Sequence, residues 1–279
     1  MQVSARHTKR LLTNAVMTTL AAACAFLAVT VLLLILGYIA YRGLTAINLQ
    51  FLIDTPRPVG EGGGIGNAIM GSFVLLLLAC LLGLPIGIAA GIYLAEYGDN
   101  WFGNTVRFVT DTLTGVPSII VGVFVYTIIV LPQRHFSTLA GGVALGLIMI
   151  PIVTRTTEEM IRLVPTSLRE GALALGAPQW RVTTGVVLPA ARAGIATGAM
   201  LAIARVSGET APLLFTAFGS RFFNWYLDQP IASLTVQIYN YAISPYDEWH
   251  AQAWAATLVL MALILLINIA VRFFTRQRF

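Results

Sequence analysis

Long runs of apolar residues constrain this chain more than any other feature of its sequence. A helix needs about 20 mostly apolar residues to cross the hydrocarbon core of a bilayer. About six runs meet this requirement, and they cover residues 16–40, 66–95, 108–131, 139–160, 190–218 and 251–274. Only 10% of the residues are charged, whereas a soluble domain has about 25%. We therefore expect an all-α integral membrane protein with about six transmembrane helices.

The first apolar run follows the basic sequence RHTKR, as the apolar part of a signal peptide would. The apolar part of a signal peptide spans about 7–15 residues, and this run is longer, so we expect a retained helix. The predicted division is a cytoplasmic tail at 1–15, a first transmembrane helix at 16–40, a transmembrane domain at 66–274 that includes a cytoplasmic loop at 161–189, and a tail at 275–279.

Basic residues lie mostly on one side of the predicted spans, and the side richer in lysine and arginine faces the cytoplasm. With the N-terminus inside, the outward-facing arginines are Arg42, Arg57, Arg134 and Arg221. The basic residues on the inner side are Arg6, Lys9, Arg10, Arg107, Arg155, Arg162, Arg169, Arg181, Arg192, Arg272, Arg276 and Arg278. Both termini are therefore expected in the cytoplasm. The formal net charge of +5 then reflects topology and does not indicate binding to nucleic acid.

Cysteine and histidine give no sign of a metal site. Cys24 and Cys80 both fall within apolar runs, and the 3 histidines are far apart in the sequence. Neither pattern fits a disulfide framework or a set of metal ligands. We expect no metal ion in this chain.

The stretch between the fourth and fifth runs, VPTSLREGALALGAPQWRVTTGVVLP, is the most informative part of the chain. Ser167 and Glu170 have the spacing of a capping box, in which each side chain bonds the other residue's backbone amide. Gly176 can adopt the left-handed conformation that ends a helix, and the proline two residues later prevents continuation. We expect a short helix at about 168–175, a sharp turn, and a second helical segment at about 179–188. Such a loop is either a docking element or an ordinary connection.

The same stretch resembles the EAA loop of ABC importer permeases, whose pattern is E-A-A, three residues, G, nine residues, I, one residue and L-P. The matching residues are Glu170, Gly171, Ala172, Gly176, Val186, Leu188 and Pro189. Gly171 replaces the first alanine of the pattern, and Val186 replaces its isoleucine. The resemblance implies that this loop inserts into a groove of a cytoplasmic ATPase subunit.

The chain lacks a nucleotide-binding P-loop of its own. That loop has the sequence G-x-x-x-x-G-K-[ST] and requires a lysine, whereas Lys9 is the only lysine here. We therefore expect no cofactor in this chain, with ATP and magnesium bound by a partner ATPase.

Arg205 and Glu209 stand inside the fifth apolar run. An arginine at the bilayer centre costs about 2.5–3.5 kcal/mol on insertion scales, so such a residue faces protein or water. On a helix the pair shares one stripe with Gly194, Gly198 and Ala202, whose small side chains allow close helix contact. Two interpretations stay open. The two residues neutralise each other as an i,i+4 pair, or Arg205 directs its planar fork of donors at an anion pathway.

Two further patterns predict local structure. Gly83, Gly87 and Gly91 recur at helical spacing in the second run, which predicts a close helix–helix contact. Arg155–Glu159 and Glu158–Arg162 are i,i+4 pairs at the inner end of the fourth run. We expect both pairs to be solvated and to contribute about 0.3–0.5 kcal/mol each.

Several longer segments resemble the PstA-type permeases of phosphate-specific ABC importers. They are GIGNAIMGSF at 64–73, GIYLAEYG at 91–98, DTLTGVPSIIVGVF at 111–124, PIVTRTTEEMIRLVP at 151–165 and ARVSGETAPLLFTA at 204–217. The resemblance implies the type I ABC importer permease fold, a transport subunit that is not itself an enzyme, and alternating access. It also places Arg205 and Glu209 in the substrate pathway.

The resemblance implies a set of partners as well. They are a second, homologous permease subunit, two copies of a cytoplasmic ABC ATPase, an extracytoplasmic phosphate-binding protein, and the lipid of a bacterial cytoplasmic (inner) membrane. Competing hypotheses are an importer permease for another oxyanion, such as sulfate or molybdate, an ATP-independent carrier, and a membrane scaffold.

Overall fold

The computed structural model of the chain describes residues 2–275, which form helices and loops without a β-strand. Outside the described part lie the side chains of Arg6, Arg272, Arg276 and Arg278, and residues 276–279 of the tail predicted at 275–279. Within residues 2–275, 5 helices are long and apolar enough to cross a membrane, or 6 if a bent helix pair counts as one span. This confirms the all-α class and the predicted number of spans.

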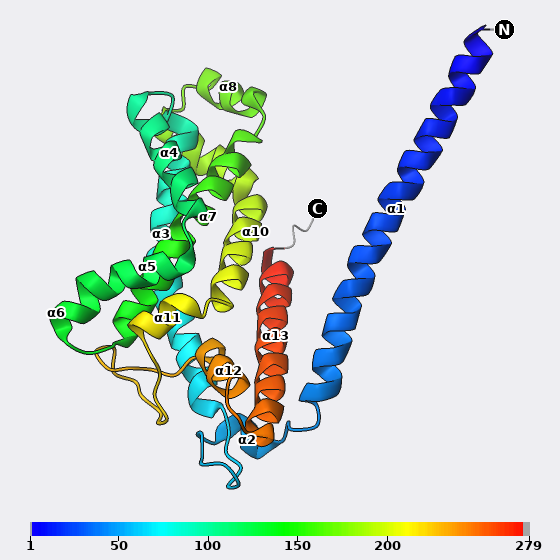
Figure 1. The fold of residues 1–279 in the computed structure, drawn as a ribbon. Coiled ribbons are helices and arrows are strands. Elements are labelled where there is room, and N and C mark those ends of the chain that lie inside the picture. Colours follow the sequence, from blue (N-terminus) through cyan, green and yellow to red (C-terminus); the bar gives the residue numbers. More distant parts are fainter. Residues whose placement is uncertain (1, 276–279) are drawn as a thin grey trace.

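Helix α1 (Gln2–Gly43) stands apart from the rest of the molecule along most of its length (Figure 1). It meets the body near its C-terminal end, where Tyr38 packs edge-on against Trp254 of α13 (Asp247–Thr275) with ring centroids 5.2 Å apart. The helix is continuous from Gln2, so secondary structure does not change between residues 15 and 16. Whether the first turns form a tail outside the membrane stays a prediction.

Helices α3 (Gly66–Tyr97) and α7 (Thr138–Arg162) form the centre of the fold. They pack closely because α3 turns its glycines toward α7. A Cβ atom on Gly87 would lie 2.7 Å from the Cβ of Val153. Gly83 faces Met149 and Gly91 faces Thr157 in the same way, which confirms the predicted helix–helix contact.

The third predicted span is not one straight helix. Helix α4 (Trp101–Gly115) ends at a bend of 103°, after which α5 (Ser118–Val125) begins. A π-helical turn (Tyr126–Val130) and α6 (Leu131–Gln133) complete this arm. The helix predicted at 108–131 is therefore broken within its length, and it is one span only if the bent pair is counted together. The cause lies in the sequence, because the residue before Pro117 is disfavoured in the helical region.

The fifth predicted span is also interrupted. A helix runs from α9 (Gln179–Val182) through a π-helical turn (Thr183–Val187) into α10 (Leu188–Ser207). The helix ends there, and the short helix α11 (Ala211–Thr216) follows in another direction (Figure 1). The second loop segment predicted at 179–188 is thus the beginning of the span, and the span does not continue to residue 218.

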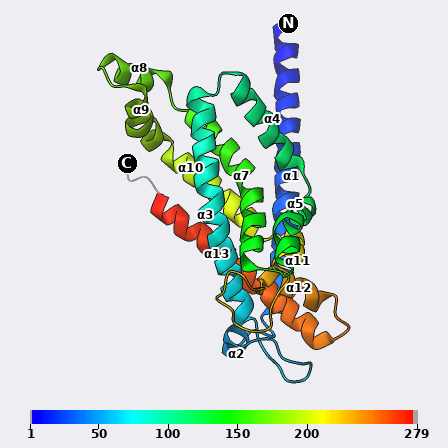
Figure 2. The ribbon, with the colours of Figure 1, turned by 90° about the vertical axis from the view of Figure 1, so that its left-hand side faces the viewer.

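The remaining helices mark the two ends of the molecule (Figures 1 and 2). Helix α8 (Thr166–Ala174) and the start of α1 lie at one end. Helices α2 (Leu49–Ile53) and α12 (Leu234–Ala242) lie at the opposite end, beside the start of α13. The loop singled out in the sequence therefore projects from one end of the helix bundle.

Candidate functional site

Arg205 lies in the last turn of α10. It lines the same cavity as Leu147 and Ile148, which stand near the middle of the 25-residue helix α7. Its depth is therefore close to the centre of the bundle. The side chain is 50% exposed within this single chain, so the guanidinium is not embedded in apolar core.

The cavity beside Arg205 has a volume of about 440 Å³ and lies at the bend between α4 and α5. Its walls are mainly apolar side chains of α5 and α7. The polar residues that line it are Thr114, Ser118 and Arg205. The cavity therefore joins one strong positive charge to two neutral hydrogen-bonding groups.

The two helix breaks lie against each other. A Cβ atom on Gly122 of α5 would lie 2.6 Å from the Cα of Pro212 in α11, so the segments that follow the two breaks are in direct contact. Non-helical backbone at membrane depth is tolerated only where it is buried in protein or lines a water-filled cavity. The paired breaks and the half-exposed arginine thus favour a polar pathway over contact with lipid.

Arg205 and Glu209 hold each other loosely. The closest approach, from Nη2 of Arg205 to a carboxylate oxygen of Glu209, is 3.9 Å. The backbone carbonyl of Glu209 accepts a 3.0 Å hydrogen bond from the hydroxyl of Thr235, which fixes the chain just past the break. A partly exposed pair contributes about 0–1 kcal/mol. This pairing alone does not account for an arginine at such depth.

The stripe predicted on α10 does face a packing surface. A Cβ atom on Gly198 would lie 2.5 Å from the hydroxyl oxygen of Thr156 on α7, and Gly194 meets Met160 of the same helix. Ala202 is fully buried. Arg205 comes next along this stripe, at the point where packing against α7 gives way to the cavity, whereas Glu209 lies beyond the end of α10 at Ser207.

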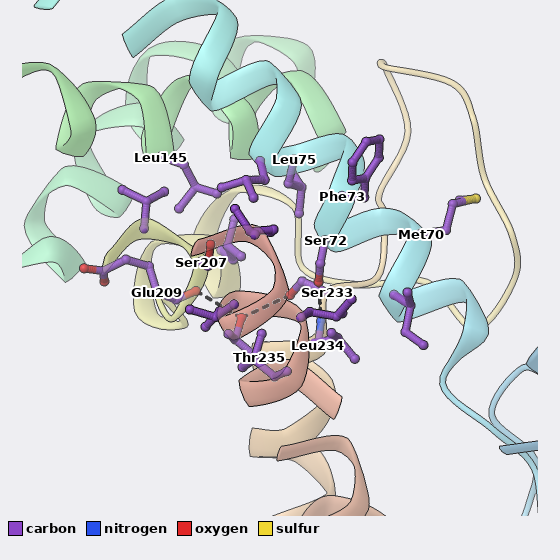
Figure 3. A pocket seen from close by; sticks show the side chains of 18 residues that line it. Met70, Ser72, Phe73, Leu75, Leu145, Ser207, Glu209, Ser233, Leu234 and Thr235 are labelled. Atoms are coloured by element: carbon purple, nitrogen blue, oxygen red, sulfur yellow. Dashed lines mark hydrogen bonds between the residues drawn. The ribbon is translucent and has the colours of Figure 1, made fainter. Parts of the chain in front are cut away.

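A second cavity, of about 340 Å³, lies on the other side of the same break (Figure 3). Figure 3 shows mainly apolar side chains around it, with the hydroxyls of Ser72, Ser207 and Ser233 among them. Glu209 borders this cavity, but its carboxylate points away from the other lining residues (Figure 3). Both cavities have mainly apolar walls, but Arg205 lines the first and the negatively charged Glu209 borders the second, so the cavity beside Arg205 is the better candidate for an anion.

In the loop that contains α8, the predicted N-terminal cap of the helix is not formed, whereas the predicted left-handed turn at its C-terminal end is formed. Helix α8 begins at Thr166 after Pro165, without a side-chain hydrogen bond at its cap, so the capping box of Ser167 and Glu170 is not formed. At its other end Gly176 has φ 81°, in the left-handed region. Its amide donates to the carbonyl of Leu173 at 2.9 Å, and the next amide donates to Ala172 at 3.3 Å. These two bonds form a Schellman motif.

The residues of the EAA-like pattern fall on the two arms of this loop. Glu170 and Gly171 are exposed on α8, and Ala172 is half-buried. Gly176 forms the turn, Val186 lies in the π-helical turn, and Leu188 and Pro189 begin α10. The large apolar side chains exposed around this end of the molecule are those of Leu163, Leu168, Leu173, Leu175 and Trp180. Exposed apolar surface of this kind marks a site of contact with another protein or with the membrane.

Glu158 forms a buried charge cluster beside the loop. Its side chain is 2% exposed, and its carboxylate lies 2.6 Å from Nε of Arg107, 3.1 Å from Arg162 and 3.4 Å from Arg155. The expectation of a solvated pair is therefore wrong for Glu158. It holds for Arg155–Glu159, a half-exposed pair at 3.2 Å. The i,i+4 spacing could not reveal Arg107, which is 51 positions away in the sequence.

Thr114 and Ser118 are the site residues that the sequence reading missed. Both flank the bend between α4 and α5, and both line the cavity beside Arg205. Gly115 and Pro117 indicate the helix break in the sequence, because glycine and proline interrupt helices. A polar residue next to a helix break within an apolar run is a sign that could have identified them.

The fold and the site together define a class. Spanning helices surround a mainly apolar cavity that Arg205 lines, at the depth where two of them break, and a helical loop with exposed apolar residues projects from one end. This is a multi-pass membrane permease. Comparison with known sequences then places it: residues 83–278 match the family described as binding-protein-dependent transport system inner membrane component, and the chain belongs to this family.

Individual relatives are similar over most of the chain. A protein of Yersinia pestis named phosphate transport system permease protein PstA is 50% identical over 233 residues, which are 83% of this chain and 79% of that protein. A protein of the same name from Pasteurella multocida is 45% identical over 271 residues, 96% of each chain.

A solved structure with a similar fold is an inward-facing conformation of the MetNI methionine ABC transporter. Its TM-score is 0.60, at 21% identity, and the match covers 77% of this chain and 95% of that one. At this identity the likeness concerns the fold alone. It confirms the fold of a type I ABC importer permease.

Proposed function

We propose that this chain is the permease subunit of an ATP-driven importer that moves inorganic phosphate across a bacterial cytoplasmic membrane. The observation that carries the proposal is the half-exposed Arg205, held at mid-depth beside a cavity between two broken helices. The phosphate permeases that are 50% and 45% identical to this chain support phosphate over sulfate or molybdate.

Arg205 supplies the fixed positive charge of the proposed pathway. Its planar guanidinium presents donors that suit the oxygens of a phosphate ion. The positive end of the α5 dipole begins at Ser118, on the same cavity. Glu209, 3.9 Å from Arg205, lowers the net attraction so that the anion can leave again.

The energy for transport comes from a partner, because the chain performs no covalent chemistry and has no P-loop. ATP and magnesium are bound by a cytoplasmic ATPase, which α8 and its exposed Glu170 contact directly. Gly171, Ala172 and Gly176 shape this docking element, and Leu188 and Pro189 connect it to α10. Movement of the loop drives alternating access of the cavity to the two sides of the membrane.

The working unit contains a second, homologous permease, two ATPase subunits and an extracytoplasmic phosphate-binding protein. The loop and both termini face the cytoplasm. Support for this orientation comes from the basic side chains Arg155, Arg162, Arg169, Arg181 and Arg192, which lie at the α8 end of the molecule.

Phosphate uptake in cells that have the other importer subunits but lack this one tests the proposal. We compare the wild-type chain, Arg205→Gln and Arg192→Gln at equal membrane abundance, with sulfate as the control anion. Arg192 is the matched control because it lies exposed on the same helix and away from the cavity. We expect phosphate-selective uptake from the wild type and Arg192→Gln. Uptake with Arg205→Gln should fall about 10-fold or more, from the loss of charged hydrogen bonds.

Other outcomes have equally clear meanings. Equal uptake by all three chains would mean that Arg205 only forms a structural pair with Glu209. A failure of Arg205→Gln to assemble would mean the same. No uptake by an assembled wild-type complex excludes phosphate as the substrate. Sulfate uptake in its place would make the chain a permease for another oxyanion.

A further inference from the structure

Glu96 is a buried carboxylate that the transport pathway does not use. It lies in the last turn of α3, at the α8 end of the molecule, and its side chain is 1% exposed. Burying a carboxylate is costly unless a charged partner and hydrogen bonds compensate for the lost water. The partners of Glu96 therefore show what it holds in place.

Arg169 of α8 is the charged partner of Glu96. One guanidinium nitrogen, Nη1, bonds the carboxylate directly. The other, Nη2, donates a 2.8 Å hydrogen bond to the backbone carbonyl of Ile161 in the last turn of α7. A single side chain thus ties α8 to the ends of both central helices. Arg169 stands directly before Glu170, so the tie acts within the segment proposed to dock.

The second arm of the loop reaches the same carboxylate. The hydroxyl of Thr183 lies 3.2 Å and the side-chain amide of Gln179 lies 3.4 Å from Oε2 of Glu96. Both residues follow the turn at Gly176, whereas Arg169 precedes it. Glu96 therefore fastens the two arms of the loop to each other and to α3.

Apolar packing contributes less to the attachment of α8. None of the residues of α8 is buried. Ala172 is half-buried against the cluster that includes Val164, Val182 and Val187. The polar joint at Glu96 is thus a main attachment of α8 to the helix bundle.

We propose that Glu96 is a positioning residue for energy coupling, which passes displacements of the loop on to α3 through Arg169 and Thr183. This inference rests on the proposed function, because it assumes that an ATPase moves the loop. Two contacts connect α3 to the transport cavity. The helix packs along α7 through its glycines, and α7 lines the cavity beside Arg205. Without the joint, each part stays folded, but the loop moves without carrying α3.

The test uses the complete importer in lipid vesicles, with wild type, Glu96→Gln, Glu96→Asp and Asp99→Asn compared. Asp99 is the matched control because it is three residues away, carries the same charge and is 96% exposed. ATP hydrolysis and phosphate transport are measured in the same vesicles. We expect Glu96→Gln to assemble and to hydrolyse ATP normally, but to move about 2- to 30-fold less phosphate per ATP. Glu96→Asp should restore part of the coupling, and Asp99→Asn should behave as wild type.

Hydrogen exchange in the same complex gives a readout that does not depend on transport. Backbone amides of residues 166–183 should exchange faster in Glu96→Gln, while those of α7 keep wild-type rates. Wild-type coupling and exchange in Glu96→Gln would overturn the proposal. Loss of assembly that Glu96→Asp does not rescue would also overturn it, since the role would then be structural. A wild-type complex that moves no phosphate contradicts the proposed function instead, and the exchange rates still decide whether Glu96 fastens the loop.

Discussion

Among single residues, Glu209 is the one through which the proposed pathway would release its anion. Its side chain is 14% exposed and lies 3.9 Å from Arg205. If this carboxylate weakens the hold of Arg205, Glu209→Gln should retain phosphate longer. We expect KM and maximal uptake rate both to fall about five-fold, which corresponds to about 1 kcal/mol. Uptake measured over a range of phosphate concentrations checks this. A higher KM at an unchanged maximal rate would mean that Glu209 orients Arg205 for binding.

Glu158 provides a second prediction for a single residue, this time for stability. Replacing it with glutamine leaves the guanidiniums of Arg107, Arg155 and Arg162 without their shared carboxylate. Breaking a buried ion pair costs about 3–5 kcal/mol, so Glu158→Gln should clearly lower the unfolding temperature in detergent. Glu159→Gln is the control, because this neighbour is half-exposed and, within the described part of the chain, forms its ion pair with Arg155. Equal melting of the two variants would contradict the prediction.

The two charged sites also show what a sequence can reveal about single residues. The depth of Arg205 followed from its place in an apolar run, since a bilayer-spanning helix has a nearly fixed length. The burial of Glu158 and Glu96 did not follow. Their partners Arg107 and Arg169 lie 51 and 73 positions away in the sequence, and local spacing carries no information about such contacts.

Among the helices, number and approximate position were predictable, whereas direction was not. Hydropathy detects length and apolar character, and both held for the spans of α3, α7 and α13. The bend of 103° between α4 and α5 depends on how α5 packs against α11, which lies far along the chain. Gly115 and Pro117 mark the place of the break, but tertiary packing sets its angle.

Helix α8 and the turn that follows it yield a prediction in which alanine has opposite effects at two glycines. Gly176→Ala places a Cβ at φ 81° and should destabilise the end of the helix by about 1 kcal/mol. Gly171→Ala meets open space inside the helix and should stabilise it by up to about 1 kcal/mol. We expect Gly176→Ala to recover less ATPase on co-purification and Gly171→Ala to recover at least the wild-type amount. The reverse order would show that the left-handed turn does not shape the docking element.

At the scale of the whole molecule, the proposed topology makes a prediction about access from the two sides of the membrane. Leu175 is 90% exposed beside α8, and Trp225 is exposed in the loop between α11 and α12. With Cys24 and Cys80 replaced by alanine, a cysteine at each position can be labelled with a maleimide that does not cross membranes. Trp225→Cys should react in intact cells, and Leu175→Cys only after the membrane is opened. The opposite pattern would invert the topology and place the loop outside.

The glycine row between α3 and α7 has a consequence for the gene. Any missense change at a glycine codon introduces a residue with a Cβ atom. At Gly83, Gly87 and Gly91 that atom would lie 2.8, 2.7 and 2.6 Å from side chains of α7, so no missense allele at these codons is sterically silent. Spontaneous mutants selected for loss of uptake should therefore gather there. The codon of Gly185, where a Cβ meets nothing within 4 Å, should be represented less often.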